Sequence, residues 1–245
     1  MKKEIDINCD LGEGMPFDQK IMPYLGSCNI ACGGHAGDDA SMEHTIGLAK
    51  KHQVKIGAHP SYPDKDNFGR ISLDLDIEIL KDSLKSQIEK IKSMAIQEKV
   101  NLHHIKFHGA LYLDSLIDQE LALELALFIK HHFPNQILYA PFGSCMANAA
   151  VRTSIPLCHE VFADRKYASA TELLPRKHPR AILTDLKEID EQVSLLLAKS
   201  SVKTIDGDFY KVKADTICIH GDHPRAVEIA KLVATKLAET TNPHS

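Results

Sequence analysis

Histidines mark the positions in this sequence that are best suited to chemistry. The chain has 14 histidines in 245 residues. Four of them follow short apolar runs typical of β-strands, and most of these four lie next to a glycine or near a carboxylate: His35, His59, His108 and His220. Since histidine titrates near neutral pH and ligates metals, these positions could transfer protons or hold a cation.

Acidic and basic side chains accompany these histidines at the same strand ends. Asp10 follows the first apolar run and precedes Gly12, which favours a functional carboxylate over an ordinary turn residue. Lys106 closes another run; facing inward it would need an anionic partner or substrate, whereas facing outward it would be solvated. Six further residues are candidates for binding substrate or phosphate: Glu13, Asp38, Arg70, Asp164, Arg165 and Asp222.

Some of these residues also have ordinary structural explanations. Asp38 could equally cap a helix that starts near Met42. Asp222 precedes Pro224, a typical first-turn proline, so capping explains much of that motif, although a Gly-Asp turn before a helix also suits an anion. His59 could be a hydrogen-bonded core histidine.

The other ten histidines fall into two groups. Six lie on expected helix faces, in loops or at the tail and are predicted to be solvated: His44, His52, His131, His132, His178 and His244. The role of the other four, which lie near the candidate site, stays undecided: His103, His104, His159 and His223. Neighbouring strand residues alternate in direction, so His103 and His104 cannot both face inward.

The elements that must position these side chains alternate between strands and helices. Strand-like runs cover 5–8, 29–31, 55–58, 103–106, 136–140, 157–162 and 216–219. Helical patterns cover 42–52, 76–98, 119–132, 186–199 and 224–238, with apolar residues in 76–98 at spacings of three and four. Such alternation predicts parallel strands joined by helices. About seven strands in this length favour an irregular, closed (β/α) barrel of the α/β class.

The chain shows no linker and no shift in composition, so we expect a single domain over residues 1–245. Residues 202–214 are predicted to form a peripheral β-hairpin that turns at Asp206 and Gly207, before the last barrel strand. In parallel α/β folds the site lies at the carboxyl ends of the strands, which is where the candidate residues fall.

The composition excludes several classes of protein. With 44% hydrophobic and 25% charged residues, the chain is typical of a globular protein and unlike disordered, collagenous or coiled-coil sequences. A net charge of −4 without long runs of one sign argues against a nucleic-acid or membrane partner. The N-terminus lacks an apolar signal segment, and the six cysteines include no C-x-x-C motif, which favours reduced thiols and a cytoplasmic protein.

Several motifs follow one another along nearly the whole chain: NCDLGEG (8–14), NIACGGHAGD (29–38), IGAHPSYPD (56–64) with FGR (68–70), KFHGALY (106–112), EVFADRKY (160–167), LLPR (173–176) and ADTICIHGD (214–222). Together they resemble the LamB/YcsF family. Gly34 and Phe107 depart from the family pattern beside retained polar residues, so they bear on pocket shape and substrate preference rather than on the chemistry.

The resemblance implies a barrel similar to those of glycoside hydrolases and deacetylases. It also implies ATP-dependent opening of the lactam of 5-oxo-L-proline (pyroglutamate) to L-glutamate, in a complex with 5-oxoprolinase subunits B and C. The chain lacks the P-loop motif G-x-x-x-x-G-K-[ST], so its ATP-binding elements would be of another type or partly supplied by partners.

Opening a lactam requires a base for the attack of water and an acid for the departing nitrogen, and phosphorylation of the amide oxygen would activate the carbonyl. We hypothesise that Asp10 is the base. The residues placed around the reacting centre, as proton donors or as stabilisers of phosphate and oxyanion, are His35, His59, His108 and His220.

The charged candidates take supporting roles in this hypothesis. Lys106 and Arg165 would pair with a substrate carboxylate or phosphate, while Asp164 and Asp222 would fix imidazole tautomers. Two alternatives stay open. A divalent metal held by Asp10, His35 and His59 could support deacetylation or amide hydrolysis without ATP; alternatively, the chain could be a non-catalytic subunit that only binds substrate.

Overall fold

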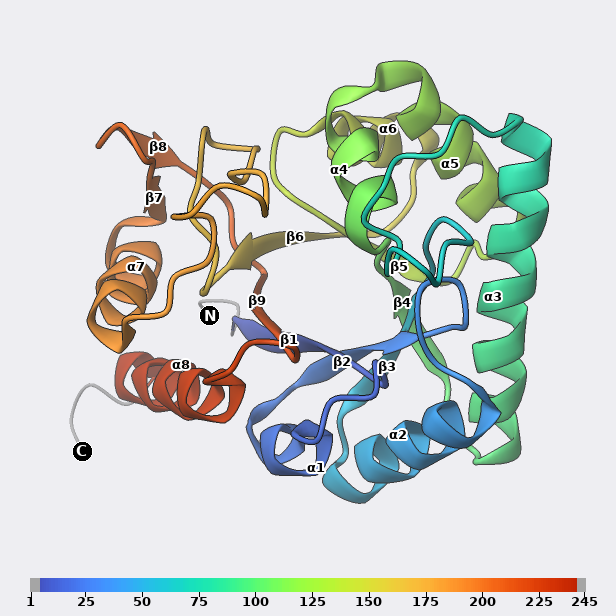
Figure 1. Ribbon diagram of the computed structural model, residues 1–245, viewed down its shortest axis with the longest axis horizontal. Helices are drawn as coiled ribbons and strands as arrows, with labels where there is room; N and C mark the ends of the chain where they lie inside the picture. Colours follow the sequence, from blue (N-terminus) through green and yellow to red (C-terminus); the bar gives the residue numbers. More distant parts are fainter. Residues whose placement is uncertain (1–4, 242–245) are drawn as a thin grey trace.

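A closed barrel of seven parallel strands forms the centre of the computed structural model, which describes residues 5–241 (Figure 1). The strands are β1 (Asp6–Leu11), β2 (Ser27–Ala31), β3 (Lys55–His59), β4 (Leu102–Ile105), β5 (Ile137–Ala140), β6 (Leu157–Phe162) and β9 (Thr216–His220). They pair in chain order, and β9 closes the barrel between β6 and β1. The predicted α/β barrel of about seven strands is confirmed.

Helices surround the barrel on its outer side (Figure 1). They are α1 (Asp18–Ile21), the 3₁₀ helix η1 (Met22–Tyr24), α2 (Asp39–His52), α3 (Ile77–Gln97), α4 (Gly109–Ile117), α5 (Gln119–His132), α6 (Cys145–Thr153), α7 (Leu186–Lys199) and α8 (Ala226–Thr241). In α3 the apolar stripe is buried, and Asp76 caps the helix by accepting bonds from the N–H groups of Glu78 and Ile79. Within the described residues, no helix has the length and apolar character needed to cross a membrane.

Each predicted strand and helix is present with small changes at its ends, while α1, α4 and α6 were not predicted. Helix α4 is separated from β4 by three residues and is only nine residues long, so its sequence is too short to show a sustained helical repeat. The predicted hairpin is formed by β7 (Ser201–Lys203) and β8 (Phe209–Lys211), which pair antiparallel outside the barrel (Figure 1).

The inside of the barrel carries a chain of polar side chains beneath the candidate site. Asn29 Nδ2 donates to Asn8 Oδ1 at 2.7 Å, and His104 Nε2 donates to Asn29 Oδ1 at 2.7 Å. His104 is fully buried and stacks on Tyr139, whereas His103 is partly exposed, as strand alternation requires. These bonds fix the amide of Asn29 under Asp10.

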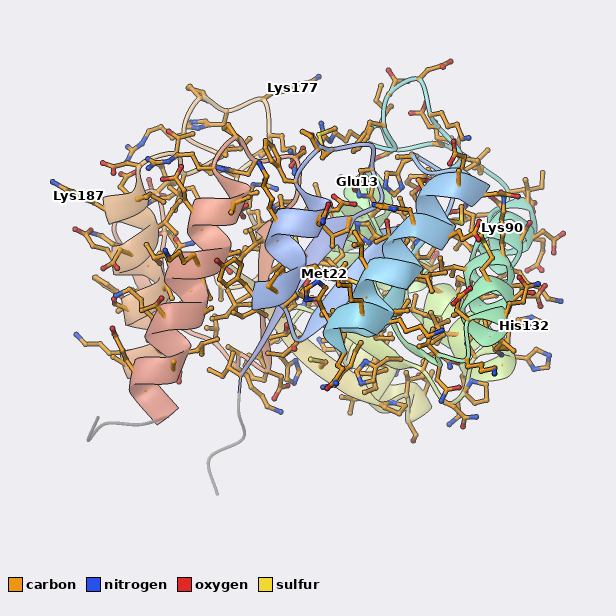
Figure 2. The ribbon with its side chains drawn as sticks, turned by 90° about the horizontal axis from the view of Figure 1, so that it is seen from below. Glu13, Met22, Lys90, His132, Lys177 and Lys187 are labelled. Carbon is orange, nitrogen blue, oxygen red and sulfur yellow. The ribbon has the colours of Figure 1, made fainter. Side chains whose placement is uncertain are left out.

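The loops that follow the strands gather at one end of the barrel. Figure 2 shows the barrel from the side, with Glu13 and Lys177 both towards this end. Parallel strands share the end at which their carboxyl termini lie, so residues distant in sequence meet there. Strand register sets Asp10 opposite Asn29 on β2 and opposite His220 on β9.

Candidate active site

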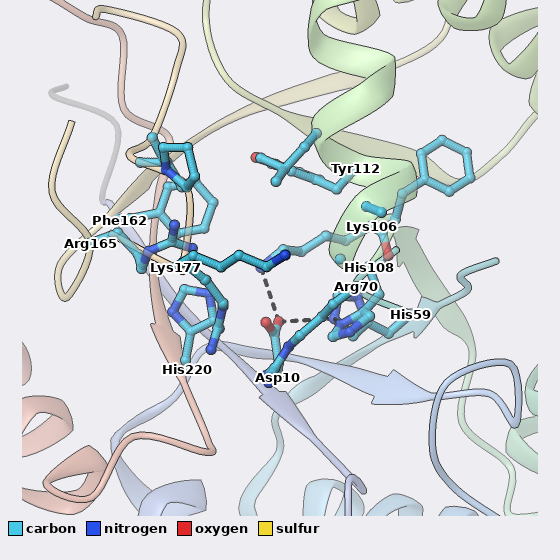
Figure 3. A pocket seen from close by; sticks show the side chains of 17 residues that line it. Asp10, His59, Arg70, Lys106, His108, Tyr112, Phe162, Arg165, Lys177 and His220 are labelled. Carbon is cyan, nitrogen blue, oxygen red and sulfur yellow. Dashed lines mark hydrogen bonds and ion pairs between the residues drawn. The ribbon is translucent and has the colours of Figure 1, made fainter. Parts of the chain in front are cut away.

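A cavity of about 330 Å³ lies at the carboxyl ends of the strands (Figure 3). Seven of the predicted site residues line it: Asp10, His59, Arg70, Lys106, His108, Arg165 and His220. Behind them, four more predicted residues contact these lining side chains or one another: Glu13, His35, Asp164 and Asp222. The barrel therefore brings together eleven of the twelve predicted residues.

Asp38 is the exception, because it serves the fold. Its exposed side chain accepts a bond from the Ser41 N–H at 2.8 Å, and Ser41 bonds back to the Asp38 N–H, which forms a capping box at the start of α2. It does not line the cavity. Capping accounts for this residue, and we do not place it in the site.

Lys106 is a buried ammonium with carboxylates on two sides. Its Nζ lies 2.9 Å from Asp10 Oδ1 and 2.9 Å from Glu160 Oε1, and it donates to Cys218 Sγ at 3.0 Å. Burial alone would lower the pKa of Lys106, but its partners, Asp10 first among them, raise this pKa well above the ordinary value. The third hydrogen bond of Lys106 goes to Asn8 Oδ1 at 3.4 Å, whereas Glu160 forms an ion pair with it without a hydrogen bond. Lys106 therefore pairs with protein carboxylates rather than with the substrate carboxylate of the hypothesis.

Asp10 is fixed from three directions. Its Oδ1 accepts from Lys106 Nζ and, at 2.8 Å, from Asn29 Nδ2, and lies 3.5 Å from His59 Nε2. Burial alone would raise the pKa of Asp10, yet Lys106 and then His59 hold it well below the usual range. A carboxylate stabilised in this way is a weak base, which argues against the hypothesis that Asp10 deprotonates water.

Beside Asp10, Glu13, His35, His59 and His108 form a group that we call the Glu13 cluster. The four residues are buried, and one ligand atom from each lies within 4.8 Å of the others. His35 and His108 stack in parallel with ring centroids 3.5 Å apart. Each residue follows or ends a different strand from β1 to β4, so barrel closure assembles the cluster.

Protonation in the Glu13 cluster follows its burial. Burial, with Asp10 the next cause, raises the pKa of Glu13 well above its ordinary value. Burial lowers the pKa of His35 to about 2 and that of His108 well below the usual range. His35 and His108 are therefore neutral at physiological pH.

The loop after β3 is held in an unusual backbone conformation against this cluster. Phe68 has φ of 56° and Gly69 has φ of 61°, the left-handed region that costs energy for a residue other than glycine. The conformation presents the Phe68 carbonyl to His108 Nε2 at 3.0 Å, and the Phe68 ring packs edge-on against His35 and His108. A methyl group at Gly69 would lie 2.9 Å from His35 Cβ, so glycine allows this close approach.

His220 lies on the side of Asp10 opposite to His59 (Figure 3) and forms a pair with Asp164. His220 Nδ1 donates to Asp164 Oδ1 at 2.8 Å, and the backbone N–H of His220 donates to Asp164 Oδ2 at 3.0 Å. Burial alone would raise the pKa of Asp164, but His220 lowers it well below the ordinary value. With its proton on Nδ1, a neutral His220 carries a lone pair on Nε2, which has no hydrogen-bond partner within residues 5–241.

Arginines supply positive charge to the cavity wall. The Arg165 side chain donates to the carbonyls of Ala181 at 3.2 Å and Leu174 at 2.7 Å, and it forms no ion pair with any described carboxylate. Arg165 is 4% exposed, and burial, with Arg176 the next cause, lowers its pKa to about 10. A buried guanidinium that faces a cavity without a counter-ion is suited to an anionic ligand.

Arg70 and Arg176 share a carboxylate at the cavity mouth. Asp222 Oδ2 lies 2.6 Å from Arg70 Nη2 and 3.0 Å from Arg176 Nη1. Asp222 therefore orients two arginines and, within residues 5–241, forms no hydrogen bond with an imidazole, contrary to our expectation. His223, which was undecided, donates from Nε2 to the Leu183 carbonyl at 2.9 Å and has a structural role.

Sequence reasoning missed several residues of the site. Glu160 was quoted within a motif but not assigned a role, although it pairs with Lys106 and accepts a bond from the Tyr112 hydroxyl at 2.8 Å. Arg176, the last residue of the LLPR motif, and Lys177, which follows it, line the cavity wall. A carboxylate at an inward strand position, as in Glu160, was the available signal, because burial of a charge requires a partner.

The remaining histidine and cysteine predictions agree with the structure where it describes them. His44, His131 and His178 are exposed, and His52 and His132 partly so, whereas His244 lies outside the described residues. The cysteines are free thiols, and burial raises the pKa of Cys9 and of Cys218 well above the ordinary value.

Comparison with known proteins identifies the family of this chain. The LamB/YcsF family pattern matches residues 5–243. The chain belongs to the LamB/YcsF family. It is 38% identical over 235 residues to the A subunit of 5-oxoprolinase from Haemophilus influenzae (strain PittEE), covering 96% of each chain. It is 39% identical over 240 residues to the corresponding 5-oxoprolinase protein of Pyrococcus abyssi, covering 96% of this chain and 94% of that one.

Solved structures show the same fold for this LamB/YcsF protein. The crystal structure of a lactam utilization protein from Thermus thermophilus matches with a TM-score of 0.89 and 33% identity, over 97% of each chain. A putative cellobiose-phosphate cleavage protein from Enterococcus faecalis V583 matches with a TM-score of 0.61 and 12% identity, over 99% of this chain and 95% of that one. At that identity the second likeness concerns the fold alone.

Proposed function

We propose that this LamB/YcsF protein is the subunit of a 5-oxoprolinase that binds 5-oxo-L-proline and opens its lactam to L-glutamate at the expense of ATP. The names of the relatives support the reaction, and one observation supports placing the reaction in this cavity. The cavity combines Arg165, a buried cation without an ion pair to any described carboxylate, with His220, whose Nε2 is free to take a proton.

The proposed substrate fits the charge of the cavity. It carries a carboxylate, which Arg165 would bind, with the exposed Lys177 on the same wall (Figure 3). Phosphorylation of the lactam oxygen adds further negative charge, which the cavity cations would stabilise. A volume of about 330 Å³ is at the small end of ligand pockets and suits a molecule of this size.

The chemistry proceeds in three steps in this proposal. ATP transfers its γ-phosphoryl group to the lactam oxygen, which makes the ring carbon electrophilic and releases ADP. His220 Nε2 then removes a proton from water as the water oxygen attacks that carbon, and returns the proton to the ring nitrogen as the C–N bond breaks, which leaves the new carboxyl group as an acyl phosphate. A second water hydrolyses this acyl phosphate to the carboxylate of L-glutamate and inorganic phosphate. Asp164 holds the imidazole in the required tautomer, and Asp10 keeps Lys106 and His59 in place.

Subunits B and C are the proposed partners, and the word "subunit" in the relatives' names supports a complex. Since the sequence has no P-loop motif, we propose that part of the ATP site comes from these partners. The predicted cytoplasmic location is part of the same proposal, because ATP is available there.

The test is reconstitution of the chain with subunits B and C, followed by measurement of ATP hydrolysis and glutamate formation with 5-oxo-L-proline. The expected result is glutamate formation coupled to ATP hydrolysis, lost in His220→Gln and retained in Arg180→Gln, a change at an exposed arginine outside the cavity. Arg165→Gln should raise the KM by about 10- to 150-fold, since a hydrogen bond to a charged group contributes about 1.5–3 kcal/mol. Glutamate formation by His220→Gln at the wild-type rate would contradict the proposal.

A second function is favoured by the Glu13 cluster, whose ligand atoms lie beside the cavity. This is metal-assisted hydrolysis of an amide or acetyl group by the chain alone. It predicts chelator-sensitive amide hydrolysis without ATP and without other subunits. Strict dependence on ATP in the reconstituted complex, with no hydrolysis of simple amides by the isolated chain, would exclude this second function.

A further inference from the structure

We propose that the Glu13 cluster is a binding site for a divalent transition metal of the zinc type. The proposed ligands are Glu13 Oε1, His35 Nε2, His59 Nε2 and His108 Nδ1. The inference concerns binding and does not depend on the lactam chemistry proposed above. It also differs from the set expected from sequence, because Glu13 and His108 take part and Asp10 does not.

The hydrogen bonds of two imidazoles provide the main argument. His59 Nδ1 lies 2.8 Å from the Lys106 carbonyl, and His108 Nε2 lies 3.0 Å from the Phe68 carbonyl. A carbonyl can only accept, so each of these nitrogens carries the proton of its ring. His59 Nε2 and His108 Nδ1 are therefore unprotonated in the neutral rings, and they face each other at 3.0 Å. Two lone pairs at this distance repel each other; either a second proton on one ring, which makes a hydrogen bond, or a metal ion bound by both nitrogens removes this repulsion.

Bonds of this kind are also what metal-binding histidines show. A ligating imidazole commonly donates its second N–H to a carbonyl or carboxylate, which fixes the ring and directs the other nitrogen to the metal. His59 and His108 both do so through backbone carbonyls. The strained backbone at Phe68 supplies one of these carbonyls, so the loop conformation maintains the orientation of His108.

The distances between the proposed ligand atoms fit a tetrahedral site. Bonds of about 2.0–2.1 Å to zinc place tetrahedral ligand atoms about 3.3 Å apart. The observed separations are 3.0 Å for His59 Nε2 to His108 Nδ1, 3.1 Å for His35 Nε2 to Glu13 Oε1 and 3.5 Å for His108 Nδ1 to Glu13 Oε1. The other pairs of ligand atoms lie within 4.8 Å of one another, so their separations would have to shorten as the four atoms surround one ion.

The donor set selects the class of cation. Three imidazole nitrogens and one carboxylate oxygen are typical for zinc or cobalt, whereas magnesium and calcium prefer oxygen ligands. Another group of possible ligand atoms comes from Asp10, Cys218 and His220. The Lys106 ammonium already bonds to Asp10 and Cys218, so positive charge is supplied there by the protein itself. The Glu13 cluster has no such ammonium among the residues described.

A metal ion can reach the Glu13 cluster from the cavity, because His59 and His108 line it. Bound there, the cation would lie next to Asp10, whose Oδ1 is 3.5 Å from His59 Nε2. The Glu13 carboxylate offsets part of the charge of a divalent ion, which lowers the cost of placing that charge in a buried site.

The test uses the untagged full chain, stripped of metal with a chelator and dialysed. Zn²⁺ is added in isothermal titration, and Co²⁺ is added to record its visible absorption. We expect one equivalent of either ion to bind and Co²⁺ to show the intense absorption of a tetrahedral site. Glu13→Gln and His108→Gln should each weaken binding by more than about 100-fold, since loss of even an outer hydrogen-bond partner costs about 10–100-fold.

The control removes the exposed and partly exposed histidines at the end of α5, His131 and His132, which could bind metal adventitiously. The double variant His131→Gln/His132→Gln should keep the full equivalent. Circular dichroism establishes that each variant is folded. The proposal is overturned if the wild-type chain binds no stoichiometric Zn²⁺, or if Zn²⁺ binding is lost in the α5 double variant and kept in Glu13→Gln. Because neither substrate nor ATP is present, this result is separate from the outcome of the lactam assay.

Discussion

Replacement of Lys106 by methionine should destabilise the protein far more than replacement of a surface lysine with a similar ion pair. Lys106 is 2% exposed and lies 2.9 Å from both Asp10 and Glu160. Methionine fills a similar volume but leaves two buried carboxylates without their cation. Removal of one partner of a buried ion pair costs about 3–5 kcal/mol.

The matched control is Lys50→Met. Lys50 Nζ lies 3.0 Å from Glu98 Oε2, but the two side chains are 48% and 40% exposed. Solvent-exposed pairs contribute about 0–1 kcal/mol, so this variant should unfold almost as the wild type does. The comparison separates burial from the ion-pair distance, which is nearly the same at the two positions.

Thermal and urea unfolding followed by circular dichroism measure the difference. For a chain of this size, 1 kcal/mol shifts the Tm by about 2–4 °C, so Lys106→Met should lower it by roughly 6–20 °C. Adding Glu160→Gln to this variant should recover part of the loss, because one of the two uncompensated charges is removed. A loss below about 1 kcal/mol in Lys106→Met, equal to that of Lys50→Met, would refute the argument that Asp10 and Glu160 depend on this ammonium.

Three further predictions follow from the site and its surroundings. Asp164→Asn should reduce turnover in the reconstituted complex by about 100- to 10,000-fold through loss of the His220 tautomer, as measured by glutamate formation. Folding lowers the pKa of Asp164 below its ordinary value of 3.8, so the ionised carboxyl stabilises the folded wild type above pH 3.8, and this stabilisation is lost as the pH falls further. The asparagine variant should not show this loss of stability in acid when unfolding is measured as a function of pH. Asp38→Ala should lower the free energy of unfolding by about 1 kcal/mol with unchanged turnover; a loss of turnover would restore Asp38 to the site. Gly34→Ala should lower the free energy of unfolding by about 1–3 kcal/mol in urea, because the added methyl group would overlap the side chains of Gln87 and Ser61, and a neutral effect would show that both side chains move aside freely.

The positions of most strands and helices could be predicted from the sequence, because they depend on the pattern of apolar and polar residues within each segment. The apolar spacing of 76–98 is a property of neighbouring residues, and the helix over Ile77–Gln97 keeps that stripe buried. Helix α4 was missed because its nine residues are too few to show the apolar repeat over several turns that identifies a helix in sequence. The capping role of Asp38 was one of two open explanations, and only the bond from Ser41 decided between them.

Local sequence pattern could not predict which charged residues pair with each other. Lys106 was expected to need an anion, and the sequence did not distinguish a substrate from Glu160, which lies on another strand and contacts Lys106 only through barrel closure. The carboxylate of Asp222 was expected to orient a histidine and instead joins Arg70 and Arg176. Opposite charges attract regardless of their separation in the chain, so geometry selects the pair.

By itself, the sequence determined the class of fold, the end of the barrel where chemistry is placed and the residue types present there. Alternating patterns and strand-end motifs are local, and parallel strands necessarily share one end. Only the tertiary structure decided what each polar group faces. In the folded chain Asp10 pairs with Lys106, Asp164 pairs with His220, and the Glu13 carboxylate lies beside three histidines. These pairings matter because the protonation and charge of a buried group depend on neighbours within a few ångströms.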